Sequence, residues 1–356
     1  MIGNRLKLAR DAAGLSLRQL QDRMGDLVSA QAIGKYERDE MMPSSAVLMS
    51  LAKALEVAPE FLMSKRELAL ADIDFRKGPA AGAKDERAVE AIVLDHAERY
   101  LELESLLPGV TVDWKAPAAK EFSIEAIEDA EEAADKLRQL WKLGIDPIPS
   151  MAELLEEKGI KVISIPLPDL VSGSKAFANQ EDRKAAALIV VNSIHNGERQ
   201  RFTLAHELGH LVLRFDKSLS HNEQEKAADR FAGAFLVAQE MLRKLLGKSR
   251  NVVAMGELLY LKGIFKVSIA MLAVRCRQLG ILTQGAYNSL WRTLKTSGLV
   301  DIGKAEPEPI PHEVPSRMRR LCLRAIAEEV ISESKAAELL RISRRDLDSL
   351  LSFHGA

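Results

Sequence analysis

The sequence predicts a mainly α-helical protein with a small β-sheet, which is the α+β fold class. In residues 1–64, helix-starting and helix-ending residues follow one another closely, as in short helices joined by tight turns. Residues 146–300 combine two short β-branched runs with amphipathic helical patterns, which favours a small sheet packed on helices. The 356 residues suffice for two or three domains. We expect four segments: 1–64, 65–145, 146–300 and 312–356.

Composition and charge exclude several classes of protein. Apolar residues make up 47% of the chain and charged residues 28%, enough for real cores in a soluble protein. The formal net charge is −1, so any contact with nucleic acid must come from a local patch. No signal peptide or long uncharged apolar stretch is recognisable, and we therefore expect a cytoplasmic protein without a membrane span. Cys276 and Cys322 lack metal-ligand spacing and cannot form a disulfide framework.

The first segment predicts five short helices with tight turns, a helix-turn-helix domain. Ser16 and Ser29 stand at the N-cap positions of the second and third helices. Pro43 opens the fourth helix and Pro59 opens the last turn.

Three stretches of this segment, GLSLRQL at 14–20, IGKYER at 33–38 and LAKALEV at 51–57, resemble the XRE (Cro/repressor-like) family of DNA-binding domains. The resemblance implies that the helix at 30–36 is the recognition helix, which enters the major groove. It also implies a homodimer, because such domains usually read paired half-sites. The alternative is a small helical interaction domain without DNA contact, because the charges of the domain roughly balance.

The resemblance assigns four DNA-binding side chains. Ser29, Gln31 and Lys35 are able to reach base edges or phosphates from the recognition helix. Gln31 can bond adenine with both ends of its amide, and Lys35 suits phosphate or guanine. Gln19, at the start of the supporting helix, looks like the phosphate-contacting glutamine of the family.

The second segment predicts a linker at 75–82, rich in Gly, Pro and Ala, followed by two long charged helices at about 84–107 and 123–143. Leu94, Leu103 and neighbouring residues give the first helix an apolar stripe, which is a core or dimerisation face. The sequence therefore predicts that this segment is a helical linker that could serve in dimerisation.

The third segment contains a His-Glu-x-x-His pattern, at residues 206–210, within an apolar helical pattern. Residues four apart on a helix lie one above the other, so His206 and His210 can bind one metal ion. Glu207 is then placed to take a proton from water at the metal. The alternative is a pair of surface histidines that form salt bridges with Glu207.

Two zinc histidines need a third protein ligand, with the fourth position left for water. Glu225 and Asp229 lie four apart on the next predicted helix, an order that resembles the gluzincin metallopeptidases. In that class, the Glu is the third ligand and the Asp holds one zinc histidine by its other ring nitrogen. Glu223 competes for the third position, but it lies off the face that Glu225 and Asp229 share, so we favour Glu225.

The run RFTLAHELGH at 201–210, followed by EKAADRFA at 225–232, resembles the ImmA/IrrE family of metallopeptidases. The run AAALIVVN at 185–192 fits as well, because such a strand edges the active-site cleft of the family. The resemblance covers roughly residues 140–300. It implies a zinc metalloendopeptidase that cleaves one repressor-type protein, often of the same helix-turn-helix class, under stress or during mobile-element induction.

Several points of the chemistry stay open. Zinc is the expected metal, and Mn²⁺ or Fe²⁺ could replace it, since affinity order alone does not settle occupancy. A donor for the developing oxyanion could be His221 or His195, although each could equally be a surface histidine. Two other functions compete: a regulator whose metal fold senses a ligand or metal without cutting, and an antitoxin-like DNA-binding module.

The end of the chain predicts a stiff extended linker at 306–311, where Pro and Glu alternate, and helices over 315–352. These helices have the rhythm of a second helix-turn-helix, and several arginines supply a local basic patch. A helical cap packed on the peptidase domain explains the pattern equally well.

Overall fold

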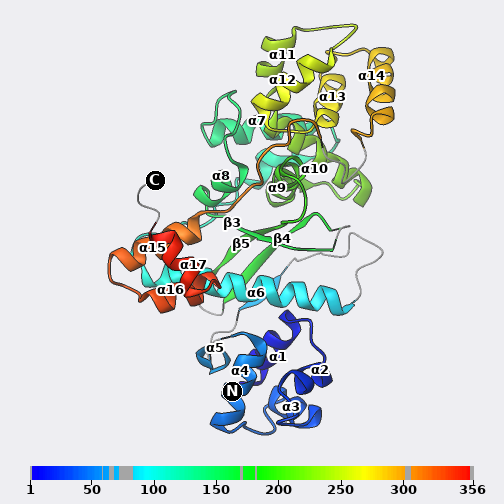
Figure 1. Cartoon of the computed structure of the whole chain (residues 1–356). Coiled ribbons are helices and arrows are strands. Elements are labelled where there is room, and N and C mark those ends of the chain that lie inside the picture. Colours follow the sequence, from blue (N-terminus) through cyan, green and yellow to red (C-terminus); the bar gives the residue numbers. More distant parts are fainter. Residues whose placement is uncertain are drawn as a thin grey trace. The chain divides into compact units, whose positions relative to one another are not determined.

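The computed structural model confirms the α+β class, with helices α1 to α17 and a small mixed sheet among the described residues (Figure 1). The chain forms two compact units: residues 1–112, 176–186 and 316–356 make the first, and residues 113–175 and 187–315 make the second. No described helix combines the length and apolar character needed to cross a bilayer. The structure describes residues 2–57, 59–63, 68–71, 83–168, 171–180, 183–300 and 306–352.

The first unit begins with the five predicted short helices. Ser16 and Gln19 form a reciprocal cap at the start of α2, with distances of 3.2 Å from Gln19 N to Ser16 Oγ and 2.8 Å from Ser16 N to Gln19 Oε1. Ser29 caps α3 by accepting the Ala32 N–H at 3.2 Å. The bounds are α1 Gly3–Ala12, α2 Leu17–Arg23, α3 Ala30–Glu37, α4 Ser45–Leu55 and α5 Pro59–Met63.

The turn between α2 and α3 is fixed by local hydrogen bonds. Gly25 and Asp26 have φ values of 65° and 58°, a left-handed pair that reverses the chain. The Gln21 side chain donates to Asp26 Oδ1 at 2.7 Å and accepts the Ala30 N–H at 2.7 Å. These bonds join the start of α3 to α2, so the angle of α3 is set by the sequence of the turn.

The long helix α6 (Ala83–Leu106) is central to the rest of the first unit. Tyr100, Leu103 and Leu107 are buried in one cluster with Met318 and Cys322 of the C-terminal helices. The predicted apolar stripe is therefore a core face within the chain. The partners of α6 are α1, β1 (Ala69–Ala71), α15 (Arg317–Ala327) and α16 (Glu333–Leu340), and α17 (Arg344–Leu351) packs on α16.

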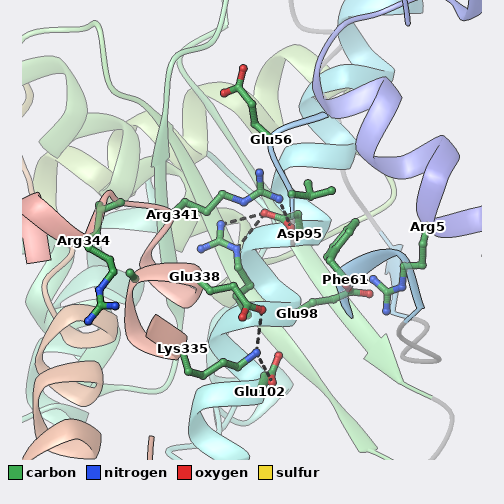
Figure 2. A pocket seen from close by; sticks show the side chains of 14 residues that line it. Arg5, Glu56, Phe61, Asp95, Glu98, Glu102, Lys335, Glu338, Arg341 and Arg344 are labelled. Atoms are coloured by element: carbon green, nitrogen blue, oxygen red, sulfur yellow. Dashed lines mark hydrogen bonds and ion pairs between the residues drawn. The ribbon is translucent and has the colours of Figure 1, made fainter. Parts of the chain in front are cut away.

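Ion pairs line a cavity of about 650 Å³ between α1, α6 and α16 (Figure 2). Arg5 of α1 pairs with Glu98 of α6, and both side chains are nearly inaccessible. Burial raises the pKa of the Glu98 carboxyl, and the Arg5 guanidinium opposes the rise. Arg341 donates to Asp95 at 2.7 Å from the opposite wall. Paired charges thus connect both the N-terminal helix α1 and the C-terminal helices to α6.

The second unit holds the parallel pair β3 (Lys161–Ile165) and β5 (Arg183–Asn192), with Lys161 opposite Leu188 and Ile165 opposite Asn192. The strand order is β1-β4-β5-β3, so β5 is an interior strand. Strand β4 (Gly173–Gln180) begins where the sequence predicts only a turn. Residues 176–186 of β4 and β5 belong to the first unit, where β1 pairs antiparallel with β4.

Helices make up most of the second unit. The second long helix expected at 123–143 is shorter, because η1 (Ala119–Phe122) and the short strand β2 (Ser123–Ile124) precede it, and β2 pairs in parallel with β6 (Arg214–Phe215). The helices are α7 Asp129–Leu140, α8 Met151–Glu157, α9 Gly197–Val212, α10 His221–Leu236, α11 Gln239–Leu246, α12 Met255–Phe265, α13 Ile269–Gln278 and α14 Gln284–Thr296.

The predicted linker is part of the second unit. We call residues 306–313 the strap. Glu306 of the strap lies 3.1 Å from Lys262 Nζ, and Glu313 accepts a hydrogen bond from Arg201 at 2.6 Å. Both basic side chains are almost completely buried. The strap is therefore held by two buried charges, Lys262 on α12 and Arg201 on α9, the helix that carries the His-Glu-x-x-His pattern.

Candidate metal centre

Helices α9 and α10 lie side by side and carry the predicted metal residues (Figure 1). The Asn196 side chain starts α9 by accepting the Arg199 N–H at 2.9 Å. Ser220 and Glu223 form a capping box at the start of α10, where the Glu223 carboxylate accepts the Ser220 N–H at 2.8 Å. These hydrogen bonds lower the pKa of Glu223. Glu223, the competing third ligand, is thus engaged in a helix cap.

Three candidate ligand side chains converge between these helices. His206 Nε2 lies 3.1 Å from His210 Nε2 and 3.4 Å from Glu225 Oε2, and His210 Nε2 lies 3.2 Å from Glu225 Oε1. A tetrahedral zinc ion bound at about 2.0–2.1 Å requires ligand atoms about 3.3 Å apart. The triangle formed by His206, His210 and Glu225 therefore fits a zinc ion.

Asp229 holds His206 from the other side of the imidazole ring. Its Oδ1 lies 2.8 Å from His206 Nδ1, so Nδ1 donates the hydrogen bond to Asp229 and Nε2 is the nitrogen that faces the other ligands. Burial alone would lower the pKa of His206. The hydrogen bonds with Asp229 and Glu225 outweigh it and raise this pKa to about 9. The surroundings therefore favour a positive charge at this point.

Glu207 is buried next to this set, with 4% of its surface exposed. Its Oε2 accepts the N–H of Lys175 in β4 at 2.9 Å. A Cβ atom at Gly173, the first residue of β4, would lie 2.5 Å from Val190 O and 2.6 Å from Thr203 Cγ2. The absence of a side chain at Gly173 thus lets β4 approach α9 closely enough to contact Glu207.

We expect Gly173→Ala to destabilise the protein by about 1–3 kcal/mol, because the added methyl group overlaps a backbone oxygen and Thr203. Denaturant unfolding followed by circular dichroism measures the loss. The double variant Gly173→Ala/Thr203→Ser removes the Cγ2 contact and should regain part of it. Unchanged stability of the single variant would show that β4 can shift away from α9 without cost.

The remaining predicted residues lie outside this set. His221 is the exposed first residue of α10, and it is not among the ligand atoms that converge in the described part of the chain. His195 is buried, with its Nε2 3.4 Å from the Asn192 side chain. The sequence analysis expected the strand at 185–192, which is part of β5, to edge the cleft, and the structure differs on this point. Strand β5 is interior, and β4 supplies the backbone contact to Glu207, which the sequence analysis missed.

The predicted DNA-binding side chains are exposed in the structure. Gln31 and Lys35 lie one turn apart on α3, and Ser29 begins that helix. Gln19 is exposed at the start of α2, although its amide oxygen also accepts the Ser16 N–H. Apart from this cap contact, the arrangement leaves one face of α3 available to an external partner.

Two family models match separate parts of the chain. Residues 6–62 match the helix-turn-helix family, and residues 155–277 match the IrrE N-terminal-like domain. The first match covers α1 to α5, and the second runs from α8 to α13 and includes the metal residues. A search of curated proteins found no match. The resemblances seen in the sequence are confirmed: the chain fuses a helix-turn-helix domain of the XRE type with a domain of the ImmA/IrrE-like peptidase family.

Proposed function

We propose that this protein is a DNA-binding transcriptional regulator whose second unit is a zinc-dependent metalloendopeptidase. The convergence of His206, His210 and Glu225 beside the buried Glu207 is the observation that carries the proposal. Its expected substrate is a repressor-type protein cut in a stress or mobile-element response. Manganese or iron could take the place of zinc, since affinity order alone does not determine occupancy.

The residues of the site have distinct parts in this mechanism. His206, His210 and Glu225 would hold the ion, which supplies Lewis acidity towards water and a peptide carbonyl. Asp229 fixes the His206 ring. The Lys175 N–H holds one oxygen of Glu207, which leaves the other oxygen to accept a proton from the attacking water and later deliver it to the leaving amine.

Glu207 distinguishes this proposal from a regulator that only senses metal. Sensing requires the three ligands but has no need of a further carboxylate. Burying a carboxylate costs free energy unless the carboxylate is hydrogen-bonded. Glu207 is buried, and one of its oxygens accepts a hydrogen bond from the Lys175 N–H. A buried carboxylate held next to the ligand set supports hydrolysis over sensing.

The test combines two measurements on the purified full-length protein. Metal analysis should find about one divalent ion per chain. Mass spectrometry should find a single cut in an XRE-class repressor incubated with the protein. A protein that retains no divalent ion, or that cuts none of the repressors encoded near its gene, would contradict the proposal.

We expect Gln31→Ala and Lys35→Ala to weaken DNA binding while cleavage stays intact. Loss of a bidentate base contact costs roughly 1–3 kcal/mol and relaxes the preference at one base pair. Loss of a phosphate contact weakens binding to all sequences and lowers the salt dependence. Fluorescence anisotropy on DNA selected from a random pool separates the two. Arg38→Ala, on the exposed C-cap of α3, serves as control. Unaltered affinity in both variants would place the DNA contact elsewhere.

Metal binding should release protons, because the pKa of His206 lies near 9 without metal and its ring must lose a proton to become a ligand. The apparent affinity for zinc should therefore fall as pH decreases below about 9, by up to tenfold per unit for each proton displaced. Calorimetry in buffers of different ionisation enthalpy counts the protons. Asp229→Asn should release fewer protons and bind zinc roughly 10–100-fold more weakly. A pH-independent affinity would contradict this arrangement.

A further inference from the structure

A cavity of about 360 Å³ lies in the second unit, close to the metal centre. Asp229, which bonds His206, lines it, and so does Phe202, whose ring centroid lies 6.4 Å from that of His206. Phe202 precedes His206 by one helical turn, and Asp229 follows Glu225 by one turn. Residues four apart on a helix are about 5–6 Å from each other. The wall of the cavity formed by Phe202 and Asp229 therefore lies about one helical turn from the metal ligands His206 and Glu225.

The cavity continues between the faces of α9 and α10 that carry the metal residues. Gly233 lies one turn beyond Asp229 on α10, and Met271 and Val274 of α13 also line the cavity. Leu299 and Val300, which follow α14, complete the apolar lining. Phe202, Met271, Val274, Leu299 and Val300 are all partly exposed, so a ligand can reach them.

Charged side chains around the cavity already have partners. Arg275 is buried and donates to Glu131 at 2.8 Å, and Arg199 donates to Ser172 Oγ at 2.8 Å. Asp229 is occupied by His206. An incoming charged group would have to break one of these contacts, whereas an apolar group would bury the exposed apolar lining.

We propose that this cavity binds one large apolar side chain of the substrate polypeptide, such as leucine, methionine or phenylalanine, next to the bond that is cut. We call it the side-chain pocket. This inference rests on the proposed peptidase function and adds its substrate preference. The volume is at the small end of the range for ligand sites, which suits one side chain and the adjoining backbone.

Gly233 offers a way to fill the side-chain pocket without touching a metal ligand. A Cβ atom there would lie 3.7 Å from Arg275 Cδ and 3.9 Å from Met271 Cε, which are ordinary contacts. Gly233→Met should therefore place its side chain in the pocket. Gly263, in the exposed middle of α12 with nothing within 4 Å of a Cβ, is the matched control. Gly233→Ala should raise the melting temperature by about 2 °C, because alanine favours a helix over glycine.

The experiment measures binding of amino-acid hydroxamates to the zinc-loaded full-length protein by calorimetry. The hydroxamate group ligates zinc, so it brings each side chain to the metal centre. L-Leucine hydroxamate should bind at least about tenfold more tightly than glycine hydroxamate, because the leucine side chain becomes buried. Gly233→Met should abolish this difference and leave the affinity for glycine hydroxamate unchanged. Gly263→Met should retain it.

The outcomes separate the two proposals. Equal affinities for the two hydroxamates in the wild-type protein would overturn the side-chain pocket and leave the metal centre standing. The same conclusion follows if Gly233→Met stays folded and still prefers leucine hydroxamate. If neither hydroxamate binds and zinc is not retained, both the peptidase function and the pocket are wrong. The wild-type comparison decides the matter even if Gly233→Met does not fold.

Discussion

Glu207→Gln should abolish peptide hydrolysis while the protein keeps its metal ion. Glutamine has nearly the same shape but cannot accept a proton, so the general-base contribution of roughly 10²–10⁴-fold in kcat is lost. Glu207 is not one of the three converging ligands, and the amide oxygen of glutamine can still accept the Lys175 N–H. A time course of repressor cleavage by mass spectrometry, with metal content measured on the same sample, tests both parts.

Two further carboxylates provide controls for this prediction. Glu223→Gln should cut normally and lose about 0.5–1 kcal/mol of stability, because Glu223 belongs to the capping box of α10. Glu225→Gln should lose the metal ion and with it all cleavage. Normal cleavage by Glu207→Gln would refute the mechanism. Retention of metal by Glu225→Gln together with its loss in Glu223→Gln would reverse the choice of third ligand.

The metal cluster could be predicted because its information is local. The spacing of His206 and His210 on one helix, and of Glu225 and Asp229 on the next, determines which side chains share a face. The starts of helices could be predicted equally well, since Ser16 and Ser29 cap α2 and α3 by accepting backbone N–H groups three residues further along the chain. In both cases, the residues that share a helix face or a cap lie within about one helical turn of each other.

Features that depend on distant pairing were not predicted. Strand β4 begins at Gly173 because it fits against Val190 and Thr203, far along the chain. The expected helix at 123–143 loses its first turns because Ser123 and Ile124 pair with β6. The contact from Lys175 to Glu207 depends on the same tertiary arrangement. No local pattern in the sequence specifies which strand reaches the metal helix.

The strap gives a second large effect: Glu313→Gln should destabilise the protein by about 3–5 kcal/mol. Arg201 is completely buried in α9, five residues before His206, and its Nη1 donates to Glu313 at 2.6 Å. Burial lowers the pKa of Arg201, and Glu313 opposes this change. Glutamine removes the opposing charge and leaves the guanidinium buried without a counterion, which is why the expected loss is large.

Glu313 also connects α9 to α8. Its carboxylate accepts the Met151 and Ala152 N–H groups at 3.1 and 2.9 Å and the Ser150 hydroxyl at 3.0 Å. These donors are the first groups of α8, which have no partners within their own helix, and a carboxylate is favoured at a helix N-terminus. One side chain of the strap therefore stabilises two helices of the second unit.

Since α9 carries both metal histidines, Glu313→Gln should also lose zinc at a lower denaturant concentration than the wild-type protein does. Glu308→Gln is the matched control, because Glu308 lies on the same strap but is exposed, and it should change stability by less than about 0.5 kcal/mol. Urea unfolding of the zinc-loaded protein measures the loss of stability. A chelating dye in the same samples measures the zinc that is released at each urea concentration. Equal midpoints for the two variants would show that the strap merely connects the peptidase unit to the C-terminal helices. A large difference would make it part of the metal-binding fold, although its Pro- and Glu-rich sequence is typical of a linker.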